Sequence, residues 1–283
     1  MAGCGYVGSA LGVRLAAGGA QVFGLRRRPM GLPEGVEPVA ADLTDPASLA
    51  ALPSDLDLVY YAASAGARDP EAARRAYVHG VSGLLEALVR GPGPRRFFFV
   101  SSTGVYGQER GEWVDESSPT APAHPAGLSL LEGERLSLSS PFPATVVRFG
   151  GIYGPGRTML LERVRDGRAR WRPGHHTNRI HREDCAGVLH WLASVERPAP
   201  IYLGVDDEPA LERDVLSWLA RQLGAQEPAA APEEEGSGRA RGSKRCRNRR
   251  LREAGYRFRY PTFREGYAEL LSAPPPARRA SPA

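Results

Sequence analysis

The sequence predicts an α/β fold: a doubly wound parallel sheet of the Rossmann type with a small C-terminal lobe. Strand-like and helix-like segments alternate through the first half of the chain, as they do in successive βαβ units. Segments 57–64 and 95–102 are apolar almost throughout, which is typical of strands covered by helices on both faces. A glycine-rich loop, residues 3–8, opens the first helix.

Each element follows from its local pattern. Val7, Leu11 and Leu15 recur at intervals of four and give residues 7–18 one apolar helical face. The other expected helices are 70–90, 127–139, 157–166, 183–195, 209–223 and a last one within 256–271. The expected strands are 21–25, 36–43, 57–64, 95–102, 144–152 and 200–204.

The alternation loosens after residue 152, which predicts two regions. Residues 1–152 would form the Rossmann core, and residues 153–272 would form the lobe and the remaining core elements. Within the second region, 227–245 is rich in Pro, Ala and Glu and then in Gly and Arg, which predicts a mobile loop. Residues 273–283 have little to bury, so we expect a disordered tail.

Composition excludes several classes of protein. The chain has 283 residues, 42% of them hydrophobic, and no apolar run of about 18 residues that would predict a membrane span. It opens on no signal segment, so we expect a cytoplasmic protein. Three cysteines at unrelated spacings predict neither a disulfide framework nor a zinc site, and we expect no metal.

The net charge of +5 is concentrated in one run. Residues 239–250 contain seven basic residues and no acidic one, which leaves nucleic-acid binding as an alternative. The run has no aromatic residue on which a base could stack, and three glutamates at 233–235 would offset its charge. We therefore expect a small-molecule partner rather than a nucleic acid or a membrane.

The glycine loop predicts a phosphate site. Gly3, Gly5 and Gly8 form the pattern G-x-G-x-x-G: the first glycine permits a tight turn, the second admits a pyrophosphate, and the third lets the helix pack closely. Tyr6 and Val7 begin the helix, whose free N–H groups and dipole attract an anion. Because a βαβ alternation follows, we expect these residues to bind a dinucleotide.

The end of the second expected strand favours NADP over NAD. An acidic residue there would bind the ribose hydroxyls of NAD, but the sequence has Arg26 and Arg27, whose guanidinium groups match a 2′-phosphate. Solvated surface arginines are the alternative, and NAD stays open. Asp42 could meet the adenine. The remaining expected cofactor contacts are Leu43, Ala62, Ala63 and Ser64.

Five motifs together resemble the extended short-chain dehydrogenase/reductase family, also called the NAD-dependent epimerase/dehydratase family. They are GCGYVG (3–8), DL (42–43), SSTGVYG (101–107), RFGGIYGPGR (148–157) and NRIHREDCAGVL (178–189). The resemblance covers nearly the whole chain, and the segment 242–261 is similar to the end of a bacterial atypical subgroup. It implies an oxidoreductase or epimerase acting on a small or nucleotide-linked substrate, and leaves a homodimer open.

The chain departs from the family at its acid/base pair. Members combine a Ser or Thr, a Tyr and a Lys, and the resemblance assigns the hydroxyl role to Ser102, with Thr103 beside it. In PAGLSLLEGERL (125–136) the positions of the tyrosine and lysine hold Ala126 and Leu130, neither of which can transfer a proton. Tyr77 lies near the place of the usual active-site asparagine.

A substitute acid and a substrate site are therefore needed if the protein is an enzyme. We take Tyr77 and Tyr153 as the candidate acids, and Tyr106, Arg157 and Arg182 as candidate substrate contacts. The alternative is a module that binds NADP without turnover, as a sensor or regulator.

The first strand is an open question of its own. Only Met1 and Ala2 precede the glycine loop, whereas a strand of about five or six residues is usual there. We expect the neighbouring segments 21–25 and 57–63 to flank a gap with unpaired backbone groups, and we interpret Met1 as a misassigned start with the true start upstream.

Overall fold

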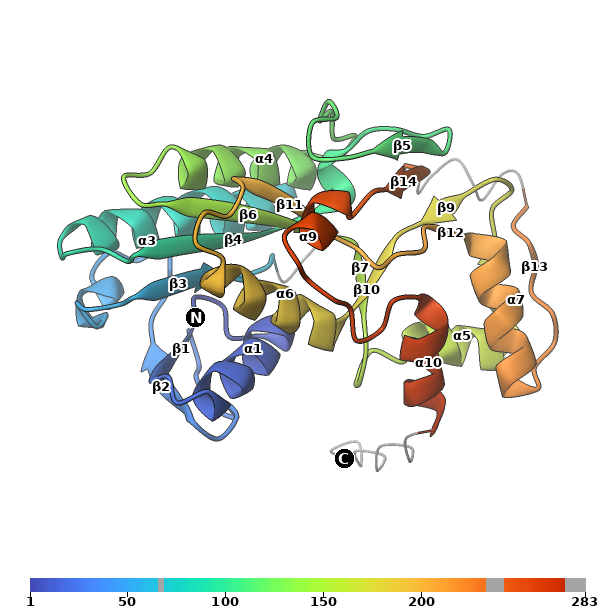
Figure 1. The fold of residues 1–283 in the computed structure, drawn as a ribbon, viewed down its shortest axis with the longest axis horizontal. Helices are drawn as coiled ribbons and strands as arrows, with labels where there is room; N and C mark the ends of the chain where they lie inside the picture. The colour runs from blue at the N-terminus through green and yellow to red at the C-terminus, as the bar shows by residue number, and fades with distance from the viewer. Residues whose placement is uncertain (66–68, 233–241, 273–283) are drawn as a thin grey trace.

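A parallel β-sheet forms the centre of the computed structural model (Figure 1), which describes residues 1–65, 69–232 and 242–272. The order across the sheet is β2 (Val36–Ala40), β1 (Val22–Arg26), the single residue Ala2, β3 (Leu58–Tyr61), β4 (Arg96–Ser102), β6 (Ala144–Phe149) and β11 (Ile201–Gly204). All these pairings are parallel. The predicted doubly wound α/β fold is confirmed.

Ala2 takes the place of the first strand. It forms parallel bridges to Leu25 on one side and to Tyr61 on the other. Its N–H donates to the Tyr60 carbonyl over 2.9 Å, and its carbonyl accepts from the Ala62 N–H over 2.8 Å. The expectation of a gap with unpaired backbone groups is therefore wrong at Ala2, because this one buried residue joins the two halves of the sheet.

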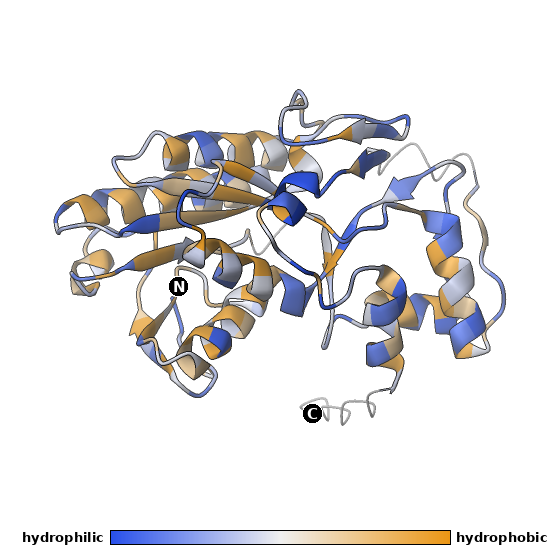
Figure 2. Ribbon diagram, in the orientation of Figure 1, coloured by the Kyte–Doolittle hydropathy of each residue, from blue (hydrophilic) through white to orange (hydrophobic). Residues whose placement is uncertain are grey.

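Helices cover both faces of the sheet. One face carries α3 (Gly80–Val89) and α4 (Pro125–Leu138), and the other carries α1 (Tyr6–Ala17) and α6 (Arg182–Ser194). Adjacent residues of a strand point to opposite faces: Tyr61 and Phe99 pack beneath α3 and α4, while Tyr60 and Phe98 pack beneath α1 and α6. Figure 2 accordingly shows hydrophobic colour along the central strands.

The helix expected over 70–90 is interrupted. It consists of α2 (Pro70–Arg74), a π-helical turn over residues 75–79 and α3. Asp69 caps its start by accepting from two backbone N–H groups. The wide turn frees the Ala76 carbonyl to accept from the Tyr61 hydroxyl, and such turns are frequent at functional sites.

The lobe beyond the sheet is built from short strand pairs and three helices. Its helices α5 (Met159–Arg165), α7 (Glu212–Leu223) and α10 (Phe263–Ser272) enclose a small core around Val215, Leu219 and Phe263. The pairs are β7 (Gly151–Tyr153) with β10 (Arg179–His181), β8 (Arg170–Trp171) with β13 (Ala229–Ala230), β9 (His176–Thr177) with β12 (Ala210–Leu211), and β5 (Glu112–Val114) with β14 (Lys244–Cys246). The short helix α9 (Arg249–Glu253) follows β14.

The segment expected as a mobile loop, 227–245, is partly ordered. β13 and the start of β14 lie within it and pair with β8 and β5, so both of its ends contain short strands, while its middle, 233–241, lies outside the described residues. Strands of two or three residues leave no periodicity to detect. The expected tail, 273–283, also lies outside. No helix in the described ranges is long and apolar enough to span a bilayer.

Candidate cofactor site

The glycine loop joins Ala2 to α1, and each glycine has a separate steric role. Gly3 has φ +82°, and a Cβ there would lie 2.3 Å from the Ala63 backbone nitrogen. A Cβ on Gly8 would lie 2.7 Å from the Gly3 carbonyl oxygen. Beside Gly5 the nearest atom is 3.9 Å away, so the loop leaves open space at the position where the motif admits a pyrophosphate.

The N-terminus of α1 is left uncapped. Gly5 precedes the helix, no side chain in the described part of the chain accepts from its first N–H groups, and no acidic residue lies in its first turn. Val7 is buried in the core and Tyr6 is half-buried. The free N–H groups and the helix dipole therefore make this end suitable for an anion.

The two arginines predicted to recognise NADP, at the end of β1, differ in their burial and contacts. Arg26, half-buried, donates to the Ser9 hydroxyl on α1 over 3.2 Å, whereas Arg27 is exposed. Asp42, after β2, accepts from the backbone N–H of Thr44 and from its hydroxyl, and these hydrogen bonds lower the pKa of its carboxyl. The structure thus brings positive charge and an ionised carboxylate to the ends of neighbouring strands.

Residues after β3 form the next part of the site. Ala62 and Ala63 lie against Gly3, because a Cβ on Gly3 would come within 2.7 Å of backbone atoms of both, and Ser64 is exposed. Leu43 packs against α3, where a Cβ on Gly83 would meet its carbonyl oxygen at 2.5 Å. Ala62 and Ala63 thus adjoin the glycine loop, and all four residues follow strands at the carboxyl edge of the sheet, the edge at which doubly wound folds bind ligands.

The candidate catalytic hydroxyls lie at the ends of β3 and β4. Ser102 accepts from the Gly104 N–H over 3.1 Å, and Thr103 beside it is buried. Tyr77, in the π-helical turn, accepts from the Ala65 N–H over 3.4 Å, which places its phenol at the end of β3. On α4, Ala126 is exposed and Leu130 is buried in the core.

Tyr106 is committed to a buried polar network that sequence reasoning did not anticipate. Its hydroxyl accepts from Arg148 over 2.7 Å and donates to the Asp115 carbonyl over 2.8 Å. Its own carbonyl accepts from the ammonium of Lys244, which is buried. With 2% of its surface exposed, Tyr106 ties β4 to β6 and β14. The only sequence signal was that Lys244 is the single lysine in the chain.

Tyr153 lies in the core of the lobe. Its ring stacks on Tyr267 at 4.5 Å, and a Cβ on Gly266 would collide with its hydroxyl. Burial raises its pKa far above the usual range. These contacts favour a packing role over proton transfer.

The other two predicted substrate contacts converge on the glycine loop. The guanidinium carbons of Arg157 and Arg182 lie 4.1 and 5.1 Å from the centre of the Tyr6 ring. The structure therefore brings these arginines beside residues predicted to bind the cofactor.

His181, directly before α6, makes the stability of the fold next to the site depend on pH. Its Nδ1 accepts from the Glu183 N–H over 3.3 Å, and burial lowers its pKa to about 4. The unfolded chain takes up this proton near pH 6.5, so between pH 6.5 and 4 it binds more protons than the folded one. Stability contributed by neutral His181 is therefore lost as the pH falls.

We expect His181→Asn, which keeps a capping acceptor, to flatten this dependence. The free energy of unfolding of the wild type should fall more steeply than that of the variant, by about 1.4 kcal/mol per pH unit below pH 6.5. Urea denaturation at a series of pH values measures both slopes. Parallel curves would contradict the assignment.

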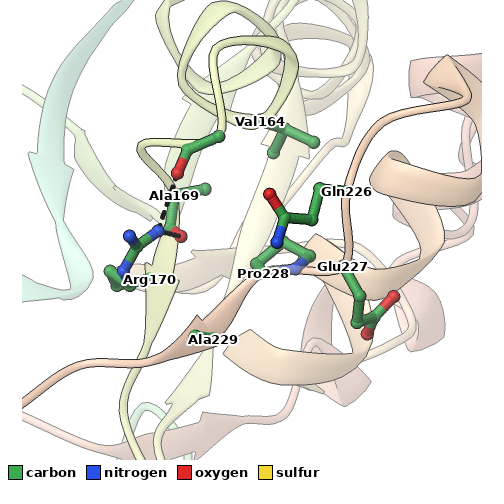
Figure 3. Close-up of a pocket in the computed structure, with 8 residues that line it drawn as sticks. Val164, Ala169, Arg170, Gln226, Glu227, Pro228 and Ala229 are labelled. Atoms are coloured by element: carbon green, nitrogen blue, oxygen red, sulfur yellow. Dashed lines mark hydrogen bonds between the residues drawn. The ribbon is translucent and has the colours of Figure 1, made fainter.

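One cavity of the structure lies away from these residues. It has a volume of about 60 Å³ and lies between the end of α5 and β13, where Arg170 folds back to donate to the Gly167 and Ala169 carbonyls (Figure 3). It is too small for a dinucleotide. Among the described residues, no group of three or more His, Cys, Asp or Glu side chains could hold a metal ion.

The sheet order, the glycine loop and the uncapped helix define an α/β protein of the dinucleotide-binding class. Residues 2–174 match the model of the NAD-dependent epimerase/dehydratase family. The chain belongs to this family.

The chain is similar to the following three proteins. A 3-diazoavenalumate denitrifying reductase of a Streptomyces species is 31% identical over 251 residues, which cover 81% of this chain and 82% of the relative. A dTDP-6-deoxy-L-talose 4-dehydrogenase (NAD(P)(+)) of Kitasatospora kifunensis is 33% identical over 174 residues, 56% of this chain and 54% of its own length. A structure described as an NAD-dependent epimerase/dehydratase of Methylobacillus flagellatus is 36% identical, with 96% of each chain covered and a TM-score of 0.79.

Proposed function

We propose that the protein is an NADP-dependent oxidoreductase or epimerase that acts on a small or nucleotide-linked substrate. The observation that carries the proposal is the uncapped N-terminus of α1. It has open space beside Gly5, and Arg26 and Arg27 at the end of β1 lie near the same helix, where Arg26 contacts Ser9. The first group of donors suits a pyrophosphate, and the arginines suit a 2′-phosphate. The similar reductase and nucleotide-sugar dehydrogenase support this class of reaction.

In this proposal, different residues of the chain orient the substrate and transfer the proton. Bound NADPH would supply a hydride to the substrate. The hydroxyls of Ser102 and Thr103, at the end of β4, would orient a substrate oxygen by hydrogen bonding. Tyr77, whose phenol is held at the end of β3, would supply or accept the proton that Ala126 and Leu130 cannot.

A second candidate function is cofactor binding without turnover. It is favoured by the side chains of Ala126 and Leu130, which leave α4 without an acid/base pair while the glycine loop is intact. Such a protein would change the affinity of a partner according to whether NADP is bound.

Measuring NADPH consumption distinguishes the two functions. We expect the wild type to oxidise NADPH with at least one member of a panel of carbonyl compounds and nucleotide-linked 4-keto sugars, and Tyr77→Phe to lose most of that rate while still binding NADPH. Tight NADPH binding with no oxidation across the panel would favour the non-catalytic module. If Tyr77→Phe kept the full rate, another residue would have to supply the acid.

A further inference from the structure

The lobe reaches the glycine loop through Tyr6, the first residue of α1. The Tyr6 hydroxyl donates to the Pro155 carbonyl over 3.0 Å. This approach depends on Gly154, because a Cβ there would lie 2.9 Å from that hydroxyl. The loop after β7 is thereby fixed directly over the start of α1.

Two guanidinium groups lie over the same ring, one from the lobe (Arg157) and one from the start of α6 (Arg182). Arg157 lies over Tyr6 at 4.1 Å and donates to the Ile152 carbonyl, while Arg182 lies over it at 5.1 Å. A guanidinium group has five N–H donors, so both retain donors for a further acceptor. Stacking fixes the plane of each group, which limits the entropy lost when it binds an anion.

The N-termini of two helices meet at this point. α1 and α6 lie side by side (Figure 1), and Arg182, the first residue of α6, contacts Tyr6, the first residue of α1. The two helix dipoles therefore add their positive ends at one place. This is a stronger attraction for an anion than α1 alone provides.

His181 supplies a separate indication of a missing acceptor. Because its Nδ1 accepts from the Glu183 N–H, the proton of the neutral ring lies on Nε2. This Nε2 is buried and has no hydrogen-bond partner among the described residues. A Cβ on Gly154 would lie 3.2 Å from it, close to the Tyr6 hydroxyl.

Two acidic residues in the first turn of α6 reduce this positive charge without cancelling it. Asp184 is occupied inside the fold, where it accepts from the Tyr256 hydroxyl and the Tyr260 N–H. Glu183 pairs with Arg182 over 2.8 Å. Arg157 has no carboxylate partner in the described part of the chain, so a positive charge remains beside Tyr6.

We propose that Arg157 and Arg182 bind the pyrophosphate of the dinucleotide and thus belong to the cofactor site rather than to the substrate site. The inference rests on the proposed NADP-binding function and adds a second wall to it. The glycine loop contributes N–H groups from the core, Arg182 contributes charge from the start of α6, and Arg157 contributes charge from the lobe. Cofactor binding thereby joins the lobe to the core through Arg157.

Titration of Arg157→Gln and Arg182→Gln with NADPH, NADH and ADP tests the proposal. All three ligands contain a pyrophosphate, so each variant should raise all three dissociation constants about 10-fold to 100-fold. Arg157→Lys, which keeps the charge but loses the planar donors, should fall between glutamine and wild type. Arg165→Gln removes the same charge from an exposed position on α5 and should leave all three constants unchanged.

Comparison variants separate this site from that of the 2′-phosphate. Replacing both Arg26 and Arg27 with glutamine should weaken NADPH and leave NADH and ADP unchanged. If the Arg157 and Arg182 variants behave in the same way, or bind all ligands within twofold of wild type, the inference is wrong while the proposed function stands. A wild type that binds neither dinucleotide would overturn both.

Thermal melting of each variant provides the control for folding. Variants that melt within a few degrees of wild type and lose affinity for ADP support the proposal. If a glutamine variant does not fold, the lysine variant decides the case, because its retained charge preserves packing on Tyr6 and only the bidentate contact to phosphate is lost. Unchanged ADP binding by a folded lysine variant of each arginine would overturn the inference.

Discussion

Replacing Gly3 with alanine is expected to abolish measurable NADPH binding and to lower the free energy of unfolding by about 2–5 kcal/mol. The residue has φ +82°, which costs an L-residue about 1–2 kcal/mol. The new methyl group would also lie 2.3 Å from the Ala63 nitrogen and 2.7 Å from the Ala62 carbonyl carbon. Because both are backbone atoms, relief requires the loop to move away from β3, at a further cost of about 1–3 kcal/mol.

Gly19→Ala is the matched control for this prediction. Gly19 has nearly the same φ, +84°, but apart from its chain neighbours no described residue has an atom within 4 Å of its absent Cβ. It should therefore show the conformational cost alone and bind NADPH as the wild type does. Urea denaturation and fluorescence titration measure the two effects. Equal destabilisation by both variants would show that the close contact with Ala63 is unimportant.

Arg148→Met is expected to lower the free energy of unfolding by about 3–5 kcal/mol. Arg148 forms a bidentate pair with Glu134, with N–O distances of 2.9 and 2.7 Å, and both side chains are almost fully buried. The Ser101 hydroxyl also donates to Glu134 over 2.6 Å. Removing the arginine would leave a buried carboxylate with one donor and the Tyr106 hydroxyl without its charged partner.

The double variant Arg148→Met, Glu134→Leu should recover much of this loss, because it leaves no unpaired buried charge. Arg74→Gln provides a second comparison. It breaks the largely exposed ion pair of Arg74 on α2 with Glu132 on α4, the helix that also carries Glu134, in which the N–O distance is 3.7 Å. This substitution should cost less than about 1 kcal/mol. Guanidinium denaturation measures all three. A single Arg148→Met variant as stable as Arg74→Gln would contradict the structural role of the buried pair.

Features carried by short stretches of sequence could be predicted. The run Phe97–Phe98–Phe99 alternates between the two faces of the sheet and is fully buried on both, which its apolar character already indicated. The conformation of the glycine loop could likewise be predicted from its sequence. Gly3 and Gly8 are required by contacts within a few residues or with the end of the adjacent strand.

Features that depend on distant partners could not be predicted. Ala2 replaces a strand only because Leu25 and Tyr61 lie on either side of it. Glu134 lies within the segment 127–139 that the sequence predicts as a helix, yet its role comes from Arg148 on β6. Arg157 and Arg182 are predicted as substrate contacts from motifs near the lobe, whereas their common position on Tyr6 depends on how the lobe and α6 fold.

The interrupted helix shows a third kind of limit. Residues 70–90 carry a continuous helical pattern, and nothing local marks the wide turn at 75–79. It arises where the Tyr61 hydroxyl binds the Ala76 carbonyl and where a Cβ on Gly80 would meet that same hydroxyl. This turn sets the position of Tyr77, so the candidate acid depends on a contact with the sheet that helix periodicity does not report.

Calorimetric titration of the wild-type protein with NADPH and with NADH tests whether the chain is an NADP-binding protein. We expect saturable binding of one NADPH per chain and a dissociation constant for NADH at least about 10-fold higher, since the 2′-phosphate that Arg26 and Arg27 would bind is missing from NADH. Equal or tighter binding of NADH would contradict the assignment of NADP, and the absence of saturable binding for both would contradict the cofactor site itself.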